Sequence, residues 1–503
     1  MKLRLIGHDY KFAVEQIMLS LFPNEKPEYV TESIEANTDL LAVSRLSLTG
    51  NRFAQATTVL HVGQERFVAV KRVCKSKLGD SLTKNRLLQR IIKQSFYKAA
   101  LKFLDTAPPW GCLTGIRPTK VIVDALESGR SDRYAGRLLQ REYGVAKAQS
   151  ETCIHAAKVT IEEKRKIKQG DIALYVGIPF CPSRCAYCSF VSNAVEKSID
   201  FIEPFLKTLE REITVIAELI EELGLSVSVL YIGGGTPTIL PPSMLTHLMQ
   251  LLQNRFELSK LREYTVEAGR ADTVDDEKLA TISAFGAGRL CINPQSMSER
   301  VLEAIGRKHS PADVRNAFAL ARRYDMAINS DIIAGLPQDS PEEFARTVDI
   351  LLHEKPENMT IHTLSLKKGS KIMLENTKIP SDVEVAHMLS YASSELSAGN
   401  YFPYYLYRQK FTSGGFENIG WALPGYKCMY NVYMMEELCT VIALGGGGVT
   451  KLVSGTGRIE RVFNAKFPRE YIGSEEKIAK KVEDIRNFYK QEIITGGKNE
   501  LLF

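Results

Sequence analysis

Three cysteines lie close together near the middle of the chain, in the run Cys181-Pro-Ser-Arg-Cys185-Ala-Tyr-Cys188. Thiolates are strong ligands for soft metals, and one loop with this spacing can wrap a compact metal group. A closed structural zinc site needs four ligands. No fourth cysteine or histidine follows nearby, since Phe190 and Ser192 come next. Three thiolates instead fit a 4Fe-4S cluster with one iron left open, so we predict these cysteines as cluster ligands.

A glycine-rich loop, Gly233-Gly-Gly-Thr-Pro-Thr238, follows some distance along the chain. Glycines have no Cβ atom, so the backbone N–H groups of such a loop can come close to a bound ligand. An open iron also needs an incoming ligand. The two loops together therefore predict a pocket in which a small molecule binds beside the cluster.

The elements that must position these loops are short β-branched runs that alternate with amphipathic helices. The predicted strands are Ala173–Gly177, Val227–Ile232, Tyr264–Val266, Arg289–Ile292, Ala327–Ile333 and Thr360–Leu364. Strands separated by helices require right-handed crossovers and hence a parallel sheet. We predict an α/β domain with an open or closed barrel over residues 169–370.

Each predicted strand ends in a residue or loop with chemical capacity. The cysteine loop follows the first strand and the glycine loop the second. The other four ends carry, in order, Glu267, Gln295, Asp331 and Ser365. Parallel α/β sheets place their chemistry at the carboxyl ends of the strands, so this register predicts one site at the mouth of the barrel.

Two further regions flank the predicted barrel. Residues 1–168 read as a separate α+β domain, with a strand at Leu3–Ile6, a helix at Phe12–Leu21, a hairpin around Gly63 and a charged run at its end. Residues 371–503 read as a mostly helical extension that covers the substrate. Aromatic residues at 401–433 are much denser than the 9% of the whole chain. They predict, with equal weight, a packed core or a wall for a flat apolar substrate.

Composition narrows the class of protein. The 503 residues carry 65 basic and 59 acidic side chains, and a net charge of +6 gives no reason to expect a nucleic-acid partner. Nine cysteines in a chain of this length are unlike a secreted disulfide framework. The amino terminus lacks the pattern of a signal peptide, and no segment is long and apolar enough to span a bilayer. We therefore expect a cytoplasmic protein.

These motifs together resemble the radical S-adenosylmethionine (SAM) superfamily. The cysteine spacing, Tyr187 before the last cysteine and the GGGTPT loop carry this resemblance. The chain resembles in particular the oxygen-independent coproporphyrinogen III oxidase family, also called coproporphyrinogen dehydrogenase, and within it the long Firmicute-type branch. The runs that match, in order, are Tyr175-Val-Gly-Ile-Pro-Phe-Cys181, Ile232-Gly-Gly-Gly-Thr-Pro-Thr238, Asn293-Pro-Gln-Ser-Met297, Ile305-Gly-Arg-Lys-His309, Asp331-Ile-Ile-Ala-Gly-Leu-Pro337, Tyr404 to Gln409 and Gly415-Phe-Glu-Asn-Ile-Gly420.

The resemblance implies a partial (β/α)6 radical SAM barrel and two cofactors, a 4Fe-4S cluster and SAM. In that family the methionine amino and carboxylate groups of SAM chelate the open iron, and the reduced cluster splits SAM to give a 5′-deoxyadenosyl radical. By motif, the positions that hold SAM are Tyr175, Gly234, Glu267 and Arg307. Glu267 suits a ribose hydroxyl or an ammonium group, and Arg307 suits a carboxylate.

Further positions match by motif, and some of them serve a second SAM molecule in the family, so one or two molecules of SAM are expected. These residues are Tyr187, Gly235, Thr236, Gln295, Asp331 and Ser365. The family reaction takes a hydrogen atom from the β-carbon of a propionate side chain and then releases CO2 and an electron to leave a vinyl group. It occurs twice on the porphyrinogen.

The resemblance also implies partners: a tetrapyrrole substrate and an electron donor such as flavodoxin or ferredoxin. A tetracarboxylate substrate needs cations near the mouth of the barrel. The sequence offers Arg307, Lys308, Lys367, Lys368 and Arg408.

Two positions depart from the family pattern. True oxidases carry another cysteine where this chain has Phe190, and a histidine where it has Gly177. The replacement at Phe190 also occurs in related haem chaperones and haem-degrading radical methyltransferases. Three functions therefore stay open: a coproporphyrinogen III oxidase that forms protoporphyrinogen IX, a radical methyltransferase or ring-opening enzyme acting on haem, and a haem-binding chaperone.

Overall fold

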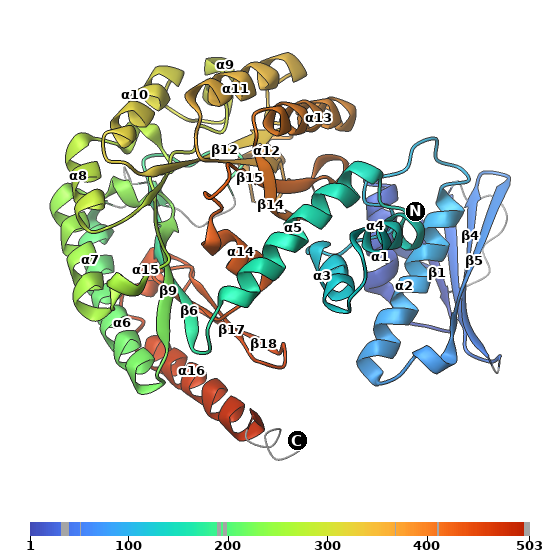
Figure 1. Ribbon diagram of the computed structural model, residues 1–503. Helices are drawn as coiled ribbons and strands as arrows, with labels where there is room; N and C mark the ends of the chain where they lie inside the picture. The colour runs from blue at the N-terminus through green and yellow to red at the C-terminus, as the bar shows by residue number, and fades with distance from the viewer. Residues whose placement is uncertain are drawn as a thin grey trace. The chain divides into compact units, whose positions relative to one another are not determined.

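The chain folds into two compact units (Figure 1). The computed structural model describes residues 1–31, 40–50, 52–188, 193–194, 199–367, 369–409 and 412–496, so Phe190, Ser192 and Lys368 lie outside the described residues. One unit comprises Met1–Ile154 with Gly414–Phe416, and the other comprises His155–Ser413 with Glu417–Phe503. The boundary between them falls inside helix α5 (Lys147–Lys166), upstream of the point where the sequence predicts it.

The first unit contains a five-stranded sheet of order β2-β1-β3-β4-β5. Strand β1 pairs in parallel with β3, whereas β4 and β5 form an antiparallel hairpin. The hairpin turns at Gly63, where φ is +56°, a value that favours glycine. Its strands are β1 (Lys2–Ile6), β2 (Glu28–Tyr29), β3 (Leu40–Ser47), β4 (Phe53–Val62) and β5 (Glu65–Cys74). The strand, helix and hairpin predicted here are present.

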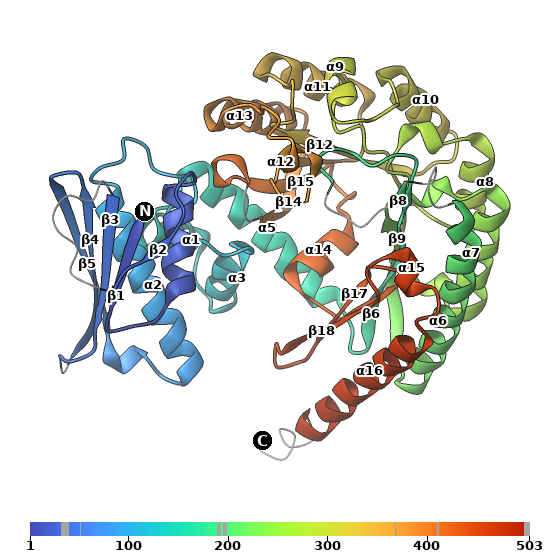
Figure 2. The ribbon, with the colours of Figure 1, turned by 180° about the vertical axis from the view of Figure 1, so that it is seen from behind.

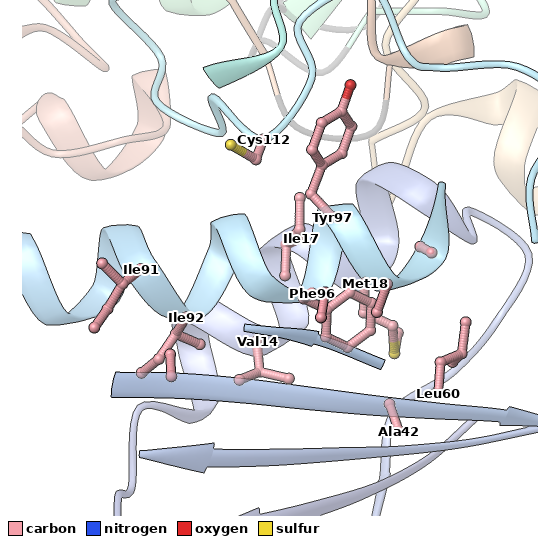
Figure 3. Packing of buried hydrophobic residues seen from close by; sticks show 14 of the residues in the cluster. Val14, Ile17, Met18, Ala42, Leu60, Ile91, Ile92, Phe96, Tyr97 and Cys112 are labelled. Carbon is pink, nitrogen blue, oxygen red and sulfur yellow. The ribbon is translucent and has the colours of Figure 1, made fainter. Parts of the chain in front are cut away.

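Helices cover one face of this sheet. Residues Val14 and Ile17 of α1 and Phe96 of α2 pack against strand residues Ala42 and Leu60, and all five are buried (Figure 3). Strand side chains alternate between the two faces of a sheet, so one face supplies this core and the other does not. The helices of the unit are α1 (Lys11–Leu21), α2 (Ser81–Ala100), α3 (Thr119–Glu127) and α4 (Asp132–Leu138).

The second unit is built on an eleven-stranded sheet of order β14-β15-β13-β12-β11-β10-β9-β6-β16-β17-β18. The six predicted strands are adjacent and parallel in chain order, so the predicted partial barrel is confirmed. They are β6 (Asp171–Ile178), β9 (Ser226–Gly234), β10 (Glu263–Glu267), β11 (Arg289–Cys291), β12 (Ala327–Ala334) and β13 (Asn358–Thr363).

Helices pack along the outer side of these strands (Figures 1 and 2). They follow the βα alternation that the sequence predicts. No helix in the part of the chain that the structure describes is long and apolar enough to cross a membrane. The helices after α5 are α6 (Ile202–Glu222), α7 (Pro242–Arg255), α8 (Asp276–Ala284), α9 (Glu299–Ala304), α10 (Pro311–Arg322), α11 (Pro341–Glu354), α12 (Lys371–Leu374), α13 (Asp382–Ala398), α14 (Met429–Glu436), α15 (Pro468–Tyr471) and α16 (Glu475–Gly496).

The carboxyl-terminal region adds strands that the sequence pattern does not reveal. Besides its helices it contributes β14 (Phe402–Arg408), β15 (Glu417–Ala422), β16 (Val441–Leu444), β17 (Val449–Val453) and β18 (Ile459–Phe463). Strand β15 is buried at every position and β16 has four apolar residues, so neither shows the alternation by which a half-buried strand is recognised. Strand β16 pairs in parallel with β6 and so extends the barrel sheet by one strand.

A buried charge cluster ties the carboxyl-terminal region to helix α6. The carboxylate of Glu212 accepts hydrogen bonds from Lys481 at 2.8 Å, Tyr471 at 2.6 Å and the Gly445 N–H at 2.8 Å. Asn464 donates a further bond at 2.9 Å. The side chains of Lys481 and Glu212 are 2% and 0% exposed, so neither ion has water as an alternative partner.

Glu212→Ala is expected to lower the free energy of unfolding by about 3–5 kcal/mol, because it leaves the Lys481 ammonium buried without its counter-ion. The measurement is the midpoint of urea unfolding. Glu222→Ala is the matched control, since Glu222 pairs with Arg486 at 2.8 Å between the same two helices but at the surface. It is expected to cost much less than Glu212→Ala, because water and salt screen an exposed ion pair. Equal losses in the two variants would contradict this account.

Candidate functional site

A cavity of about 390 Å³ opens in the second unit, at the carboxyl ends of the parallel strands. Every site residue predicted from the sequence lines it. They are Cys181, Cys185, Cys188, Tyr175, Tyr187, Gly234, Gly235, Thr236, Glu267, Gln295, Arg307, Asp331 and Ser365. Residues from six different strand ends thus face one space, as the register of the sequence predicts.

The cysteine loop is held from several sides. Cys181 ends the short strand β7 (Phe180–Cys181), which pairs with β8 (Asn193–Ala194). The Thr236 hydroxyl donates to the Cys181 sulfur at 3.6 Å. Ser183, between the first two cysteines, donates to the Gly306 carbonyl at 3.1 Å. It also accepts a bond from the buried Arg270 guanidinium at 3.0 Å, so the loop is fixed by contacts from two other strand ends.

The glycine loop packs directly against the backbone that leads to the cysteines. The N–H of Gly235 donates to the Ile178 carbonyl at 2.8 Å and that of Thr236 to the Phe180 carbonyl at 2.8 Å. The Gly234 N–H donates to the Glu267 carboxylate at 3.1 Å. These N–H groups therefore join protein segments, which differs from the expectation that they point at a ligand. Because glycines have no side chain, the glycine loop can approach the backbone that leads to the cysteine loop closely.

Gly235→Ala is expected to prevent assembly of the cluster loop, because a Cβ atom at residue 235 would lie 2.4 Å from the Phe180 carbonyl oxygen. Backbone must move to relieve that contact, and Phe180 immediately precedes the first cysteine. The measurement is iron content after anaerobic reconstitution, with a reduction of at least tenfold expected. Gly288→Ala is the control, since its Cβ would meet nothing within 4 Å. Full iron loading of Gly235→Ala would contradict the packing argument.

Arg307 links three parts of the site although its side chain is buried. One guanidinium nitrogen donates to the carbonyls of Asn293 and Gly269, the second of these at 3.2 Å. The other donates to the Tyr187 hydroxyl at 3.1 Å. Burial opposes the charged form, yet Tyr187 and Cys185 raise the pKa of Arg307, so the site keeps a permanent positive charge beside the cysteine loop.

Two half-buried carboxyl groups, Glu267 of β10 and Asp331 of β12, differ in charge. Burial raises the pKa of Glu267 to about 8, and the nearby Asp331 adds to this effect. Burial also favours a higher pKa for Asp331. Hydrogen bonds from His362 and from Thr360 outweigh this effect and hold the pKa of Asp331 below its usual value. At neutral pH the cavity therefore contains one carboxylate at Asp331 and one carboxyl group at Glu267 that a cationic ligand can deprotonate.

A sequence model of the radical SAM superfamily matches residues 175–351. The oxygen-independent coproporphyrinogen-III oxidase-like protein HemZ of Bacillus subtilis is 36% identical over 370 residues, which cover 72% of this chain and 74% of that protein. The chain belongs to this radical SAM family.

More distant members of this radical SAM family bear different names. The heme chaperone HemW of Escherichia coli is 26% identical over 310 residues, covering 61% of this chain and 77% of that protein. Coproporphyrinogen III oxidase, anaerobic 1, of Cereibacter sphaeroides is 27% identical over 303 residues, which cover 56% of this chain and 63% of that protein. The structure of the radical SAM enzyme coproporphyrinogen III oxidase (HemN) of Escherichia coli has a TM-score of 0.51 at 21% identity, covering 64% of this chain and 72% of that one. This last likeness shows a shared fold.

Radical SAM proteins use a 4Fe-4S cluster and SAM, and the donor set in the cavity fits them. All three cysteines are half-buried and line the cavity. Over the described ranges, no three Cys, His, Asp or Glu side chains converge as the ligands of a single metal ion would. A cube offers each thiolate its own iron, so its ligands need not converge on one point. Glu267 and Arg307 place a carboxyl group and a guanidinium group at the same cavity.

Several residues that line this radical SAM site, among them Tyr231, Tyr430 and His362, are not among the cluster and SAM residues that the sequence predicts. Tyr231 and Tyr430 stack with ring centroids 4.3 Å apart, and Tyr175 stacks with both. His362 lies 3.6 Å from the Asp331 carboxylate and contacts the Tyr407 hydroxyl at 3.4 Å. For the residues of strand β14 the density of aromatics is the usable signal. For Tyr231 and His362 the signal is their place within or just before a strand end.

The cations predicted near the mouth separate into two groups. Arg307 and Lys367 line the cavity. Lys308 and Arg408 do not, and Arg408 is buried on strand β14. Among the described residues, the cavity is lined by two buried guanidinium groups, those of Arg307 and of Arg270, which pairs with Asp272, and by one lysine.

Proposed function

We propose that this chain is a radical SAM oxidoreductase of tetrapyrrole metabolism. Its reaction is the oxidative decarboxylation of two propionate side chains of coproporphyrinogen III to vinyl groups, which gives protoporphyrinogen IX. The observation that carries the proposal is the single cavity that joins the cluster cysteines, the SAM residues and an aromatic wall. The identity of 36% to the HemZ protein supports it.

The residues divide the cavity between cofactor and substrate. Cys181, Cys185 and Cys188 would hold the cluster, whose open iron, with SAM bound, supplies the radical that abstracts a hydrogen atom. Glu267 would accept a hydrogen bond from the ribose or ammonium group of SAM, and Arg307 would orient its carboxylate. The further SAM positions would serve the same molecule or a second one. An electron donor such as flavodoxin or ferredoxin would reduce the cluster.

The substrate side of the cavity is aromatic with a polar margin. Tyr405 and Tyr407 of β14, Tyr430 and Met435 provide flat apolar surface. Lys367 lies at the same cavity and would bind a substrate carboxylate. These groups would hold the propionate. Its β-carbon would lose a hydrogen atom to the 5′-deoxyadenosyl radical, the bond to the carboxylate would break to release CO2, and one electron would pass to an external one-electron acceptor as the double bond forms.

The test is anaerobic mass spectrometry of the reduced, reconstituted protein with SAM and coproporphyrinogen III. Two successive losses of CO2 from the tetrapyrrole, with matching 5′-deoxyadenosine, are expected. SAM cleavage with an intact tetrapyrrole would refute the decarboxylase proposal and leave the radical SAM family unaffected.

A second candidate is a haem-binding chaperone. The similarity to the heme chaperone HemW favours it, and His362 in the cavity is a group that binds iron. In that case haem would bind tightly to the protein and be released unchanged. Haem that returns methylated or ring-opened would instead identify an enzyme acting on haem. The same mass spectra, recorded with haem in place of coproporphyrinogen III, separate these outcomes.

A further inference from the structure

The sheet of the first unit has a second face that none of the unit's helices covers. Residues Ala42 and Leu60 point toward the helices (Figure 3), so the neighbouring residues Leu41, Val43 and Val59 point to the opposite side. None of these three belongs to the hydrophobic core of the unit. We call this surface the open face. It comprises Lys2, Arg4, Ile6, Leu41, Val43, Arg45, Ser47, Phe53, Gln55, Thr57, Val59, His61, Arg66, Val68, Val70, Arg72 and Cys74.

The centre of the open face is apolar. The register places Val43 opposite Val59 and Val59 opposite Val68, so three valines form a row across β3, β4 and β5. Val70 continues the patch and is 44% exposed. When one face of an antiparallel sheet is exposed to water, the residues on that face are usually polar and alternate along each strand with the apolar residues of the core face. A valine patch at these positions marks a surface that a partner covers.

The margin of the open face is basic. Lys2 and Arg4 lie on β1, Arg45 on β3, and Arg66 and Arg72 on β5. Among the described strands of the sheet, two residues are acidic. Glu65 of β5 lies in the register of the other face, and Glu28 of the edge strand β2 lies opposite Lys2 on the open face. The face therefore combines an apolar centre with a margin that has five basic residues and one acidic residue.

We propose that the open face binds a second protein, whose contact surface is an apolar patch surrounded by carboxylates. Apolar centres with complementary charged margins are typical of protein interfaces, in which the charges speed association and select the partner. A single-stranded nucleic acid would instead need a row of aromatic side chains on which successive bases stack. Among the described residues of the open face the aromatic side chains are Phe53 and His61, which lie eight positions apart on β4. A second copy of this chain would bring like charges together.

The experiment uses the full chain with a photo-crosslinking amino acid in place of Val70, in the cells from which the protein comes. A crosslinked protein is identified by mass spectrometry, purified and titrated against the unmodified chain. We expect the crosslinked peptide to be acidic and apolar, and the affinity to fall as salt rises from 50 to 300 mM.

Charge reversal tests the same contact. The double variant Arg45→Glu with Arg66→Glu is expected to weaken binding of the purified partner by about tenfold or more. Arg133→Glu, a reversal at an exposed arginine of α4, is the matched control and should leave the affinity unchanged. SAM cleavage should be the same in all three proteins, which separates this surface from the proposed chemistry. Crosslinks to RNA, to a second copy or to nothing, or equal affinity of the double variant, would overturn the proposal.

Discussion

Cys185→Ala is expected to abolish both the brown 4Fe-4S absorbance and all 5′-deoxyadenosine formation by the reduced protein with SAM. In the proposed site three protein thiolates hold the cluster, and its fourth iron stays open for SAM. Removal of one thiolate leaves a second iron without a protein ligand, and the cube is lost. The measurements are iron and sulfide content, visible absorbance and mass spectrometric quantification of 5′-deoxyadenosine, each expected at background level.

Cys74→Ala provides the control for this prediction. Cys74 ends strand β5 in the first unit and is a half-buried free cysteine, as Cys185 is. Its removal should leave iron content and SAM cleavage unchanged. Normal SAM cleavage by Cys185→Ala would show that this cysteine is not a ligand. Loss of the cluster in both variants would point to a general effect of removing cysteines.

The parallel strands and their ends could be predicted because the signals are local. Five of the six parallel strands between Asp171 and Thr363 contain two or more β-branched residues, and a helix follows each of the six. Each polar residue lies just after its own strand or late in it. The parallel arrangement then brings those ends together without any knowledge of long-range contacts. For this reason Glu267 and Asp331, far apart in sequence, could be assigned to one cavity.

The carboxyl-terminal aromatics show what local patterns leave open. The sequence gives equal weight to a packed core and a substrate wall, and strand β14 supplies both. Tyr405 and Tyr407 lie on one face of the strand and line the cavity. Tyr404, on the other face, is 0% exposed and bonds with Asn431 at 3.1 Å. Which face meets the cavity depends on pairing with β15, which is itself next to β13, and no local pattern specifies that pairing.

Glu267→Gln is expected to raise the dissociation constant for SAM by roughly 10- to 150-fold. A hydrogen bond to a charged group contributes about 1.5–3 kcal/mol, and each 1.4 kcal/mol is a factor of ten. Glutamine has nearly the shape of glutamate and can still accept the bond from the Gly234 N–H. The change therefore removes charge and leaves the packing in place. The measurement is anaerobic equilibrium dialysis of SAM against the reconstituted protein, whose cluster absorbance should match that of the wild type.

The pH dependence of SAM binding gives an independent check. With a pKa of about 8 in the free protein, Glu267 must lose a proton before its carboxylate can bind the donors of SAM. Wild-type affinity should therefore rise as pH increases from 6.5 to about 8 and then level off. In Glu267→Gln this rise should disappear. Parallel pH profiles in the two proteins would exclude Glu267 as the titrating group.

The stability of the SAM-free protein should change in the opposite direction. Because the pKa of Glu267 is raised from 4.5 to about 8 on folding, its contribution to stability is present at low pH and is lost as pH rises through that range. Glutamine does not titrate. The melting temperature of Glu267→Gln relative to the wild type should therefore increase between pH 5 and pH 8.5. A variant that binds SAM more weakly yet melts at a higher temperature at pH 8.5 would show that the Glu267 carboxyl group strengthens SAM binding and lowers the stability of the SAM-free protein.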